Sequence, residues 1–352
     1  MKYGLLEYRY NHFTHFARQW KTAGVYSINI GDYIQTLAVR RILLALGIDA
    51  KDILYLNRDA LRSYTGEPVL LVMNACFEDA SFPLPSAIKP LFIGFQTTDR
   101  RLVDNHWKLL KGHEPIGCRD VATQRLLLKA GIKAYTTGCL TLTFPRRQEA
   151  PHEAFPLLAT GAGAGALPPQ LRQHLPAPLG NSLQEFSQRM EVHAFPPGER
   201  DVRAAFSRAG TLLDLYRERA SLVITPLLHA ASPCLGMGIP VILARKDMDS
   251  RFTAIRKLVP VHTPCTFSAI SWEPAVPAVD SIQEALLALT NRMLSGHPAP
   301  ADEIAFLDEQ FARPDRQPWR HPTMIPGPRR NQPFLLHPPD RTVSAAACQM
   351  QR

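Results

Sequence analysis

Residues 221–244 (SLVITPLLHAASPCLGMGIPVILA) hold one histidine, His229, in an apolar run without Asp, Glu, Lys or Arg. The pattern is typical of a strand, a tight turn, a helix and a second strand, with His229 where the helix begins. Such runs place chemistry at the carboxyl edge of an α/β sheet. There an imidazolium could act as an acid or donate to a phosphate beside free helix N–H groups. A hydrogen-bonded core histidine is the alternative.

The same run is long enough to span a membrane. Pro226, Pro233 and Pro240 divide it into pieces of about six residues, the length of buried strands. The sequence therefore favours the core of an α/β protein over a membrane span.

Two charged side chains stand where turns lead into predicted helices. Asp32 follows a glycine turn, a position that suits an N-cap as well as a catalytic base. Arg119 follows the short apolar run 115–118 and precedes Asp120. Its role is open between an anion ligand, an ion pair with Asp120 and a helix-end charge.

Weaker candidates lie on or just after other predicted strands. They are Asn74, Gln96, Asp99 and His193. At strand ends Asn74, Gln96 and Asp99 could bind the hydroxyl groups of an acceptor, although core caps or loop hydrogen bonds are the favoured explanation. His193 is a lone histidine within a predicted strand.

Apolar runs and helical periodicity alternate along the whole chain. We expect strands at 69–73, 91–95, 115–118, 157–160 and 190–195, and helices at 33–46, 120–130, 201–220, 251–258 and 282–294. This alternation predicts parallel sheets covered by helices. The length of 352 residues favours two domains, which meet in the charged, proline-bounded stretch 145–156.

Glycines and alanines alternate at 161–166 and match a relaxed dinucleotide-binding fingerprint. Pro168 and Pro169 follow almost at once, and no acidic residue ends a second strand about twenty positions on. We therefore expect a flexible loop here.

The formal charge of +9 is concentrated at the end of the chain, where residues 311–352 hold seven arginines, no lysine and two aspartates. The remainder carries only +4, too little to indicate nucleic-acid binding. Ten of the 31 prolines lie from Pro298 onward, so the tail is predicted to be a mobile, solvated arm. Contact with an acidic polymer or a membrane surface is its alternative role.

The six cysteines are scattered, with no Cys-x-x-Cys pair and no zinc-site spacing. Cys118 and Cys139 read as small core residues, because nothing nearby along the chain supplies a base for a thiolate. No secretory signal is recognised at the start, so we expect reduced thiols and a cytoplasmic protein.

Four segments, in the same order along the chain, resemble the polysaccharide pyruvyl transferase family. They are residues 29–32 (NIGD), 115–120 (PIGCRD), 138–143 (GCLTLT) and 225–240. The resemblance implies an α/β fold of two Rossmann-like domains facing across a cleft, as in glycosyltransferase-B enzymes. We place the acceptor domain at 1–147, the donor domain at 148–300, and a helix with a basic, proline-rich tail at 301–352.

The implied activity is transfer of a pyruvyl group from phosphoenolpyruvate to a sugar hydroxyl as a ketal, with release of phosphate and without a metal or other cofactor. His229 matches the histidine of the family's Arg-Leu-His signature, and Asp32 matches its Gly-Asp start. The implied catalytic residues are His229 and Asp32, and the implied substrate-binding residues are Arg119, Asn29, Gly31, Thr225 and Leu228. These roles predict that His229, Arg119 and Asp32 share one cleft.

The chain departs from the family pattern at two positions. Leu227 stands where the signature has arginine, and Cys139 stands where many relatives have aspartate. Another cation (Arg245, Lys246 or Arg251) could bind the donor, the donor could differ, or catalysis could be lost. The rival functions are a nucleotide-sugar glycosyltransferase, for which only Asp247 and Asp249 could hold a ribose, and a non-catalytic carbohydrate-binding or scaffold protein.

Overall fold

The computed structural model describes residues 2–149, 151, 153–161 and 165–312. Within them the first half of the chain builds a parallel sheet of order β3-β1-β4-β5. Its strands are β1 (Lys2–Glu7), β3 (Ile53–Asn57), β4 (Val69–Val72) and β5 (Ile88–Leu91). All four residues of β4 are buried, as expected for a parallel strand that is covered on both faces.

Single bridge pairs extend this sheet toward a further parallel pair of strands. That pair consists of β6 (Ile116–Cys118) and β7 (Ala134–Thr136). The covering helices are α2 (Ile30–Ala45), α3 (Arg100–Asn105), α4 (Trp107–Gly112) and α5 (Val121–Lys129). Gly47 and Gly131 follow α2 and α5 with positive φ, a backbone conformation that favours glycine at helix ends.

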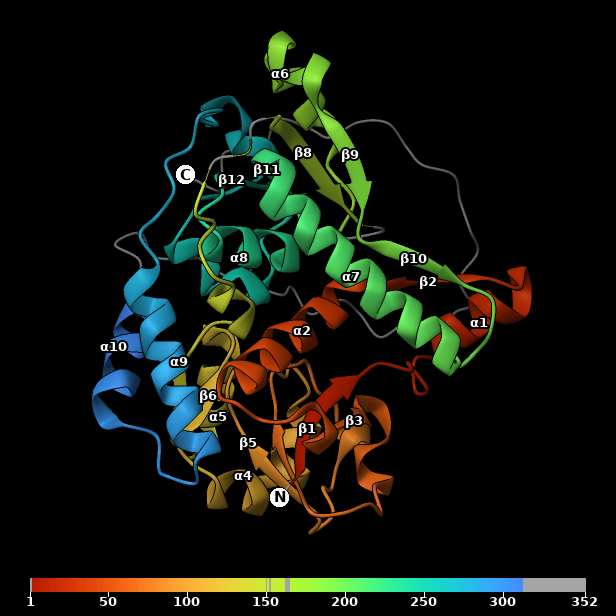
Figure 1. Cartoon of the computed structure of the whole chain (residues 1–352), viewed down its shortest axis with the longest axis vertical. Coiled ribbons are helices and arrows are strands. Elements are labelled where there is room, and N and C mark those ends of the chain that lie inside the picture. The colour runs from red at the N-terminus through yellow and green to blue at the C-terminus, as the bar shows by residue number, and fades with distance from the viewer. Residues whose placement is uncertain (1, 150, 152, 162–164, 313–352) are drawn as a thin grey trace, which may run out of the picture. The chain divides into compact units, whose positions relative to one another are not determined.

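The second half builds a five-stranded parallel sheet of order β13-β12-β11-β8-β9. Its strands are β8 (Phe155–Thr160), β9 (Gln184–Ser187), β11 (Ala220–Thr225), β12 (Val241–Ala244) and β13 (Val261–His262). Its helices are α6 (Ala177–Ser182), α7 (Glu199–Arg219) and α8 (Leu228–Gly236). Figure 1 shows this sheet above the first one, with α8 between them. The predicted α/β architecture with parallel strands is confirmed.

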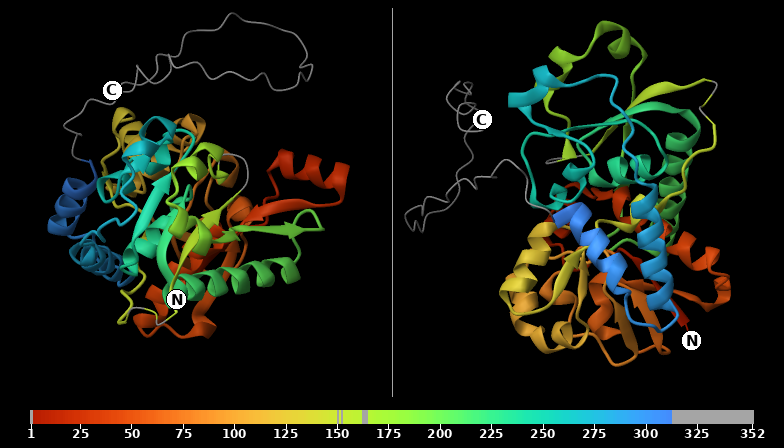
Figure 2. Two further views of the ribbon diagram at one scale, coloured as in Figure 1. Left: turned by 90° about the horizontal axis from the view of Figure 1, so that it is seen from above. Right: turned by 90° about the vertical axis from the view of Figure 1, so that its left-hand side faces the viewer.

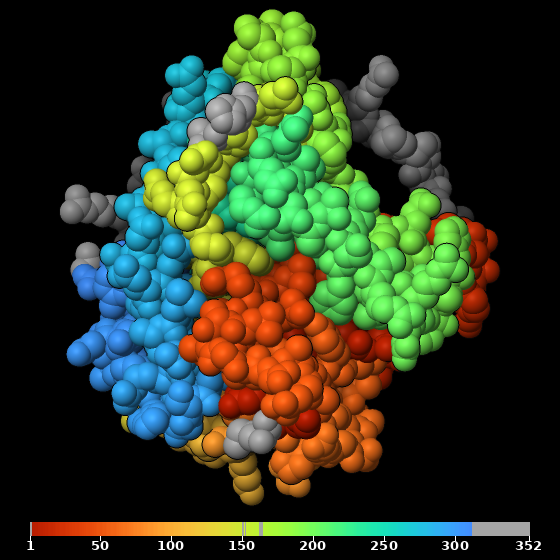
Figure 3. Space-filling model, in the orientation of Figure 1, coloured from red at the N-terminus to blue at the C-terminus, as the bar shows by residue number. Residues whose placement is uncertain are grey.

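An antiparallel pair ties the two halves together. It joins β2 (Tyr26–Asn29), which follows α1 (Thr14–Ala23), to β10 (Arg189–Val192). Helix α7, green in Figure 3, then packs across α2, drawn in red-orange. These contacts hold the first turn of α2 beside the second half of the chain.

The last two described helices return to the first half. They are α9 (Asp280–Leu294) and α10 (Ala301–Ala312), drawn in blue in Figure 2. Gln283 of α9 donates to the carbonyls of Leu142, Phe144 and Gly236 at 2.7–3.0 Å. Helix α10 packs against β7, where the Asp308 carboxylate accepts from the Thr136 backbone at 2.8 Å.

Two predicted elements are wrong, and a third is a strand that lies outside the parallel sheets. The run 91–95 is not a strand, because β5 ends at Leu91 and Gly94 turns the backbone with a φ of 69°. The predicted strand at 190–195 is present as β10, but it belongs to the antiparallel pair and not to the second sheet. Residues 251–258 form two short 3₁₀ turns instead of one helix, where the Thr253 hydroxyl accepts from the Val121 N–H at 3.1 Å.

The prediction that all thiols are reduced is also wrong, because Cys265 is disulfide-bonded. Irregular spacing along the chain does not exclude a disulfide. Cys76, Cys118, Cys139 and Cys234 are free.

No helix in the described ranges has the length and apolar character that a membrane span requires. The domain boundaries at 147/148 and 300/301 stay predictions. The predicted tail from residue 313 onward lies outside the described residues.

Candidate functional site

The first turn of α2 is fixed by side-chain hydrogen bonds. Asn29, and not Asp32, is the N-cap, since its Oδ1 accepts from the Gly31 N–H at 3.1 Å. Asp32 lies inside the helix and accepts from Asn29 Nδ2 and Gln35 Nε2, each at 3.2 Å, and from the Tyr10 hydroxyl at 2.9 Å. The N-cap interpretation of Asp32 is therefore wrong.

Asp32 is half-buried, and the positive charges of Arg58, Arg189 and Arg119 act on its carboxylate. Burial raises its pKa, while Arg58 and the Tyr10 hydrogen bond act against this rise. A carboxylate with a raised pKa and fixed orientation can accept a proton from a neighbouring hydroxyl. Its geometry is compatible with the predicted base.

The hydroxyl group of Thr225 fixes the turn that carries His229 by two hydrogen bonds. The fully buried Thr225 hydroxyl donates to the Ala159 carbonyl at 2.7 Å and accepts from the Leu227 N–H at 3.0 Å. Thr225 therefore positions the start of α8. His229 itself has a φ of −89° and a ψ of 17°, outside regular helical geometry.

His229 lies directly against the first turn of α2. A Cβ atom placed on Gly31 would be 3.0 Å from His229 Cβ and 3.3 Å from its Nδ1. Only glycine permits this approach without displacing the ring. On the other side of the ring, Nε2 is 3.8 Å from Cys139 Sγ. The structure thus brings the 29–32 turn, Cys139 and His229 together.

Burial and two arginines disfavour the charged form of His229. Burial, followed by the positive charges of Arg119 and Arg251, holds the pKa of His229 well below its usual range. The ring is therefore neutral at neutral pH in the ligand-free protein. An anion that balances the two guanidinium groups would favour the imidazolium.

Arg119 is 2% exposed and incompletely hydrogen bonded. Nη1 donates to Gln96 Oε1 at 3.4 Å, whereas Nε and Nη2 are buried without a hydrogen-bond partner in the described part of the chain. Asp120 instead caps α5 by accepting from the Thr123 N–H at 2.8 Å. No ion pair joins Arg119 to Asp120 among these residues. A buried guanidinium with unused donors is suited to bind an anion.

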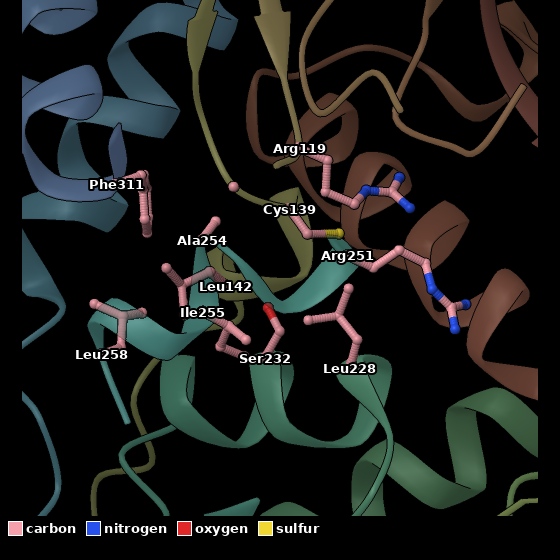
Figure 4. A pocket seen from close by; sticks show the side chains of 11 residues that line it. Arg119, Cys139, Leu142, Leu228, Ser232, Arg251, Ala254, Ile255, Leu258 and Phe311 are labelled. Atoms are coloured by element: carbon pink, nitrogen blue, oxygen red, sulfur yellow. The ribbon is translucent and has the colours of Figure 1, made fainter. Parts of the chain in front are cut away.

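A pocket lies between Arg119 and the second half of the chain (Figure 4). Its lining residues are Arg119, Gly138, Cys139, Leu142, Leu228, Ser232, Arg251, Ala254, Ile255, Leu258 and Phe311. The side chains of Arg119 and Arg251 extend toward the same side of it, away from Phe311. The space open to the centre of a water molecule is about 20 Å³, room for roughly one water. A larger ligand therefore requires side chains to move.

Arg251 is the alternative cation that reaches this pocket. Its half-exposed guanidinium is also paired with Asp249, with Nε 2.9 Å from Oδ2. Arg245 is turned into the protein, where it donates to the Pro226 carbonyl and lies 3.9 Å from the Phe252 ring centroid. Lys246 is exposed.

The weaker candidates divide into two groups. Gln96 contacts Arg119, and Asn74 Oδ1 lies 3.7 Å from Cys139 Sγ, so both are at the site. Asp99 is the N-cap of α3, and His193 is exposed beyond β10. Neither of these two lines the pocket.

Two residues near the site were missed from the sequence. Arg58, which follows β3, is buried and acts on the pKa of Asp32. Burial raises the pKa of the Cys76 thiol, against the effects of Arg58 and Arg119, which places Cys76 beside them. The only sequence signal for Arg58 is its place at the carboxyl end of a strand.

Comparison with known proteins supports the resemblance over part of the chain. Residues 80–244 match the family model described as polysaccharide pyruvyl transferase. This range includes Arg119, Cys139 and His229, and it excludes the 29–32 turn. No curated protein matches the chain. A crystal structure from Listeria monocytogenes with the provisional name UDP-N-acetylglucosamine 2-epimerase is similar with 11% identity and a TM-score of 0.39, covering 85% of this chain and 98% of that one.

Proposed function

Because residues 80–244 match the polysaccharide pyruvyl transferases, we propose that this protein transfers a pyruvyl group from phosphoenolpyruvate to a carbohydrate. The observation that carries the proposal is the buried guanidinium of Arg119, which keeps two nitrogens without a described partner in a pocket beside His229. A nearby basic group and unused cationic donors suit a small anionic substrate.

The donor would be bound through its two anionic groups. Arg119 offers Nε and Nη2 to a pair of anionic oxygens, the geometry in which guanidinium groups bind carboxylates and phosphates. Arg251, which lines the same pocket, would supply the second cation. In this arrangement Arg251 replaces the positive charge of the signature arginine, whose position is occupied by Leu227.

The chemistry begins with protonation of the methylene carbon C3 of phosphoenolpyruvate. His229, protonated once the anion is bound, gives this proton, and C2 acquires oxocarbenium character. One sugar hydroxyl adds to C2 and loses its proton to Asp32. A second hydroxyl then displaces phosphate from C2, which closes the ketal, and its proton leaves with the phosphate. Atoms and charge balance without a metal or redox cofactor. A positioned acid or base contributes about 10²- to 10⁴-fold in rate.

The remaining parts of the proposal concern binding and location. Asn29 and Gly31 shape the turn beside His229, Thr225 holds the start of α8, and Leu228 lines the pocket. The carbohydrate acceptor would lie against the first half of the chain. The proposal places the enzyme in the cytoplasm, where it would act in glycan synthesis.

The test measures phosphate release from phosphoenolpyruvate with a pool of glycan acceptors. We expect acceptor-dependent release by the wild type and a loss of at least about 10²-fold in His229→Gln. His193→Gln is the control, because His193 is exposed and away from the pocket. No release, together with no thermal shift by phosphoenolpyruvate, would overturn the proposal. A thermal shift without release would favour the non-catalytic alternative.

A further inference from the structure

The Cys139 thiol is positioned between two polar side chains. Its Sγ atom is 3.7 Å from Asn74 Oδ1 and 3.8 Å from His229 Nε2, both within hydrogen-bonding range for sulfur. Cys139 is 5% exposed and Asn74 is 2% exposed. Gly138, with a φ of 70°, turns the chain immediately before the thiol.

The backbone fixes the direction of these hydrogen bonds. The Leu140 N–H donates to Asn74 Oδ1 at 3.4 Å, so the oxygen and not the amide nitrogen of Asn74 faces Cys139. An amide oxygen only accepts, so the thiol is the donor in the 3.7 Å contact between Cys139 and Asn74. The sulfur is then left to accept, and its remaining neighbour is the Nε2 atom of His229.

The opposite side of the His229 ring faces the first turn of α2. There Nδ1 approaches Gly31, which has no side chain. The charged groups that act on the ring, Arg119 and Arg251, cannot accept a proton. The oxygens of Asp32 are already bonded by Tyr10, Asn29 and Gln35. No group in the described structure is hydrogen bonded to a proton on Nδ1.

We propose that the Asn74–Cys139 relay holds neutral His229 as the Nε2–H tautomer and leaves the Nδ1 lone pair free toward the 29–32 turn. Cys139 is thus a positioning residue. The tautomer follows from the hydrogen-bond directions alone. That Nδ1 is the atom that carries the proton in catalysis rests on the proposed function.

Long-range ¹H–¹⁵N correlation spectra of the full chain, labelled with ¹⁵N-histidine, test the tautomer. His229→Gln identifies the signal. We expect the Nε2–H pattern in the wild type and in Cys139→Ser, and a mixture of tautomers in Cys139→Ala. Cys234→Ala is the matched control, since it removes another buried thiol from α8 without touching the relay. An Nδ1–H pattern in the wild type, or an unchanged pattern in Cys139→Ala, would overturn the proposal.

Kinetics separate positioning from substrate contact. We expect kcat of Cys139→Ala to fall by up to about tenfold, the typical effect of one hydrogen bond, while KM for phosphoenolpyruvate changes less than about twofold. Cys139→Ser should recover most of kcat. A raised KM with unchanged kcat would overturn the positioning role. If the wild type has no activity, the proposed function fails, whereas the spectra still decide the tautomer.

Discussion

Two buried arginines in the first half of the chain differ in how their guanidinium groups are satisfied. Arg58, 6% exposed, donates through Nε and Nη2 to Asp59 Oδ1 at 2.9 and 2.7 Å and through Nη1 to the Cys76 carbonyl at 3.3 Å. Arg119, 2% exposed, makes one 3.4 Å contact with Gln96 and keeps two nitrogens without a partner in the described ranges. Both lie close enough to Asp32 to lower its pKa.

The difference separates a structural charge from a charge held for a ligand. Burying an unpaired ion costs free energy that the rest of the fold must offset. The neighbouring Tyr8 and Phe13 rings further stabilise Arg58, with their centroids 4.9 and 5.3 Å from its Cζ atom. Arg119 has no such ion pair with any residue that the structure describes, and it lines the pocket. Its burial is understandable if an anion completes its coordination.

Removing the charge of Arg58 should lower the stability, whereas removing the charge of Arg119 should not. Arg58→Met leaves the Asp59 carboxylate buried without its cation, which costs about 3–5 kcal/mol in the free energy of unfolding. Arg119→Met removes an unpaired charge of similar size and should leave the stability unchanged or raise it. Urea unfolding of both variants measures the difference. An equal loss in the two variants would mean that Arg119 is also a structural charge.

Arg119 should dominate donor affinity. Each charge-assisted hydrogen bond contributes about 1.5–3 kcal/mol, so the loss of two should weaken phosphoenolpyruvate binding by about 10²-fold or more in Arg119→Met. Arg119→Lys should recover only part of this affinity, because a lysine keeps the charge without the planar pair of donors. Isothermal titration calorimetry measures both constants.

Arg101→Met is the control for that titration, since its side chain is 80% exposed and its charge is paired with Asp99. Unchanged affinity in Arg119→Met would place the anion elsewhere and remove the contrast between Arg119 and Arg58.

Much of the fold could be predicted because the signals are local. The buried run that forms β4 and the periodicity of α2 are complete within their own segments. The pairing of β10 with β2 could not be predicted, since it joins residues about 160 positions apart by backbone hydrogen bonds that carry no sequence pattern. The position of the loop that brings Arg251 into the pocket with Arg119 could not be predicted either, since these residues are also far apart in the sequence.

The site could be predicted only where motif and geometry coincide. Gly31 and His229 were candidates, and they are in contact. Asn29 and Asp32 can both cap a helix, and only the backbone conformation decides between them. Arg58 was missed because its partner is its chain neighbour Asp59, a pair that resembles any surface charge pair until burial is known.

A second cation at the signature position should strengthen donor binding. Leu227 now packs against Gly161 and Gly165, where a Cβ atom on either glycine would approach its Cδ2 within 3.2 and 2.8 Å. If donor binding is limited by the missing arginine, Leu227→Arg should bind phosphoenolpyruvate about tenfold more tightly, the value of roughly one charge-assisted hydrogen bond. Leu227→Met controls for lost packing. Unchanged or weaker affinity in Leu227→Arg would show that Arg119 and Arg251 suffice.

The smallest expected effect is on the pH dependence of stability. The pKa of His229 is well below its usual range in the folded protein, because of burial and then Arg119 and Arg251. Below about pH 6.5 the unfolded chain therefore binds a proton that the folded protein does not. Stability is full above that pH and falls as the pH decreases, by about 1 kcal/mol between pH 6.5 and 5.5.

The comparison of variants isolates this contribution. His229→Gln should flatten the curve relative to the wild type, while His262, whose pKa burial also lowers, contributes equally to both. Arg119→Met should flatten it partly, because it removes one of the two charges that disfavour the imidazolium. Arg58 is not among the charges that act on His229, so Arg58→Met should keep the wild-type slope despite its lower stability. Parallel slopes in the wild type and Arg119→Met would mean that the unpaired guanidinium does not act on His229, and the two buried arginines would then differ in hydrogen bonding alone.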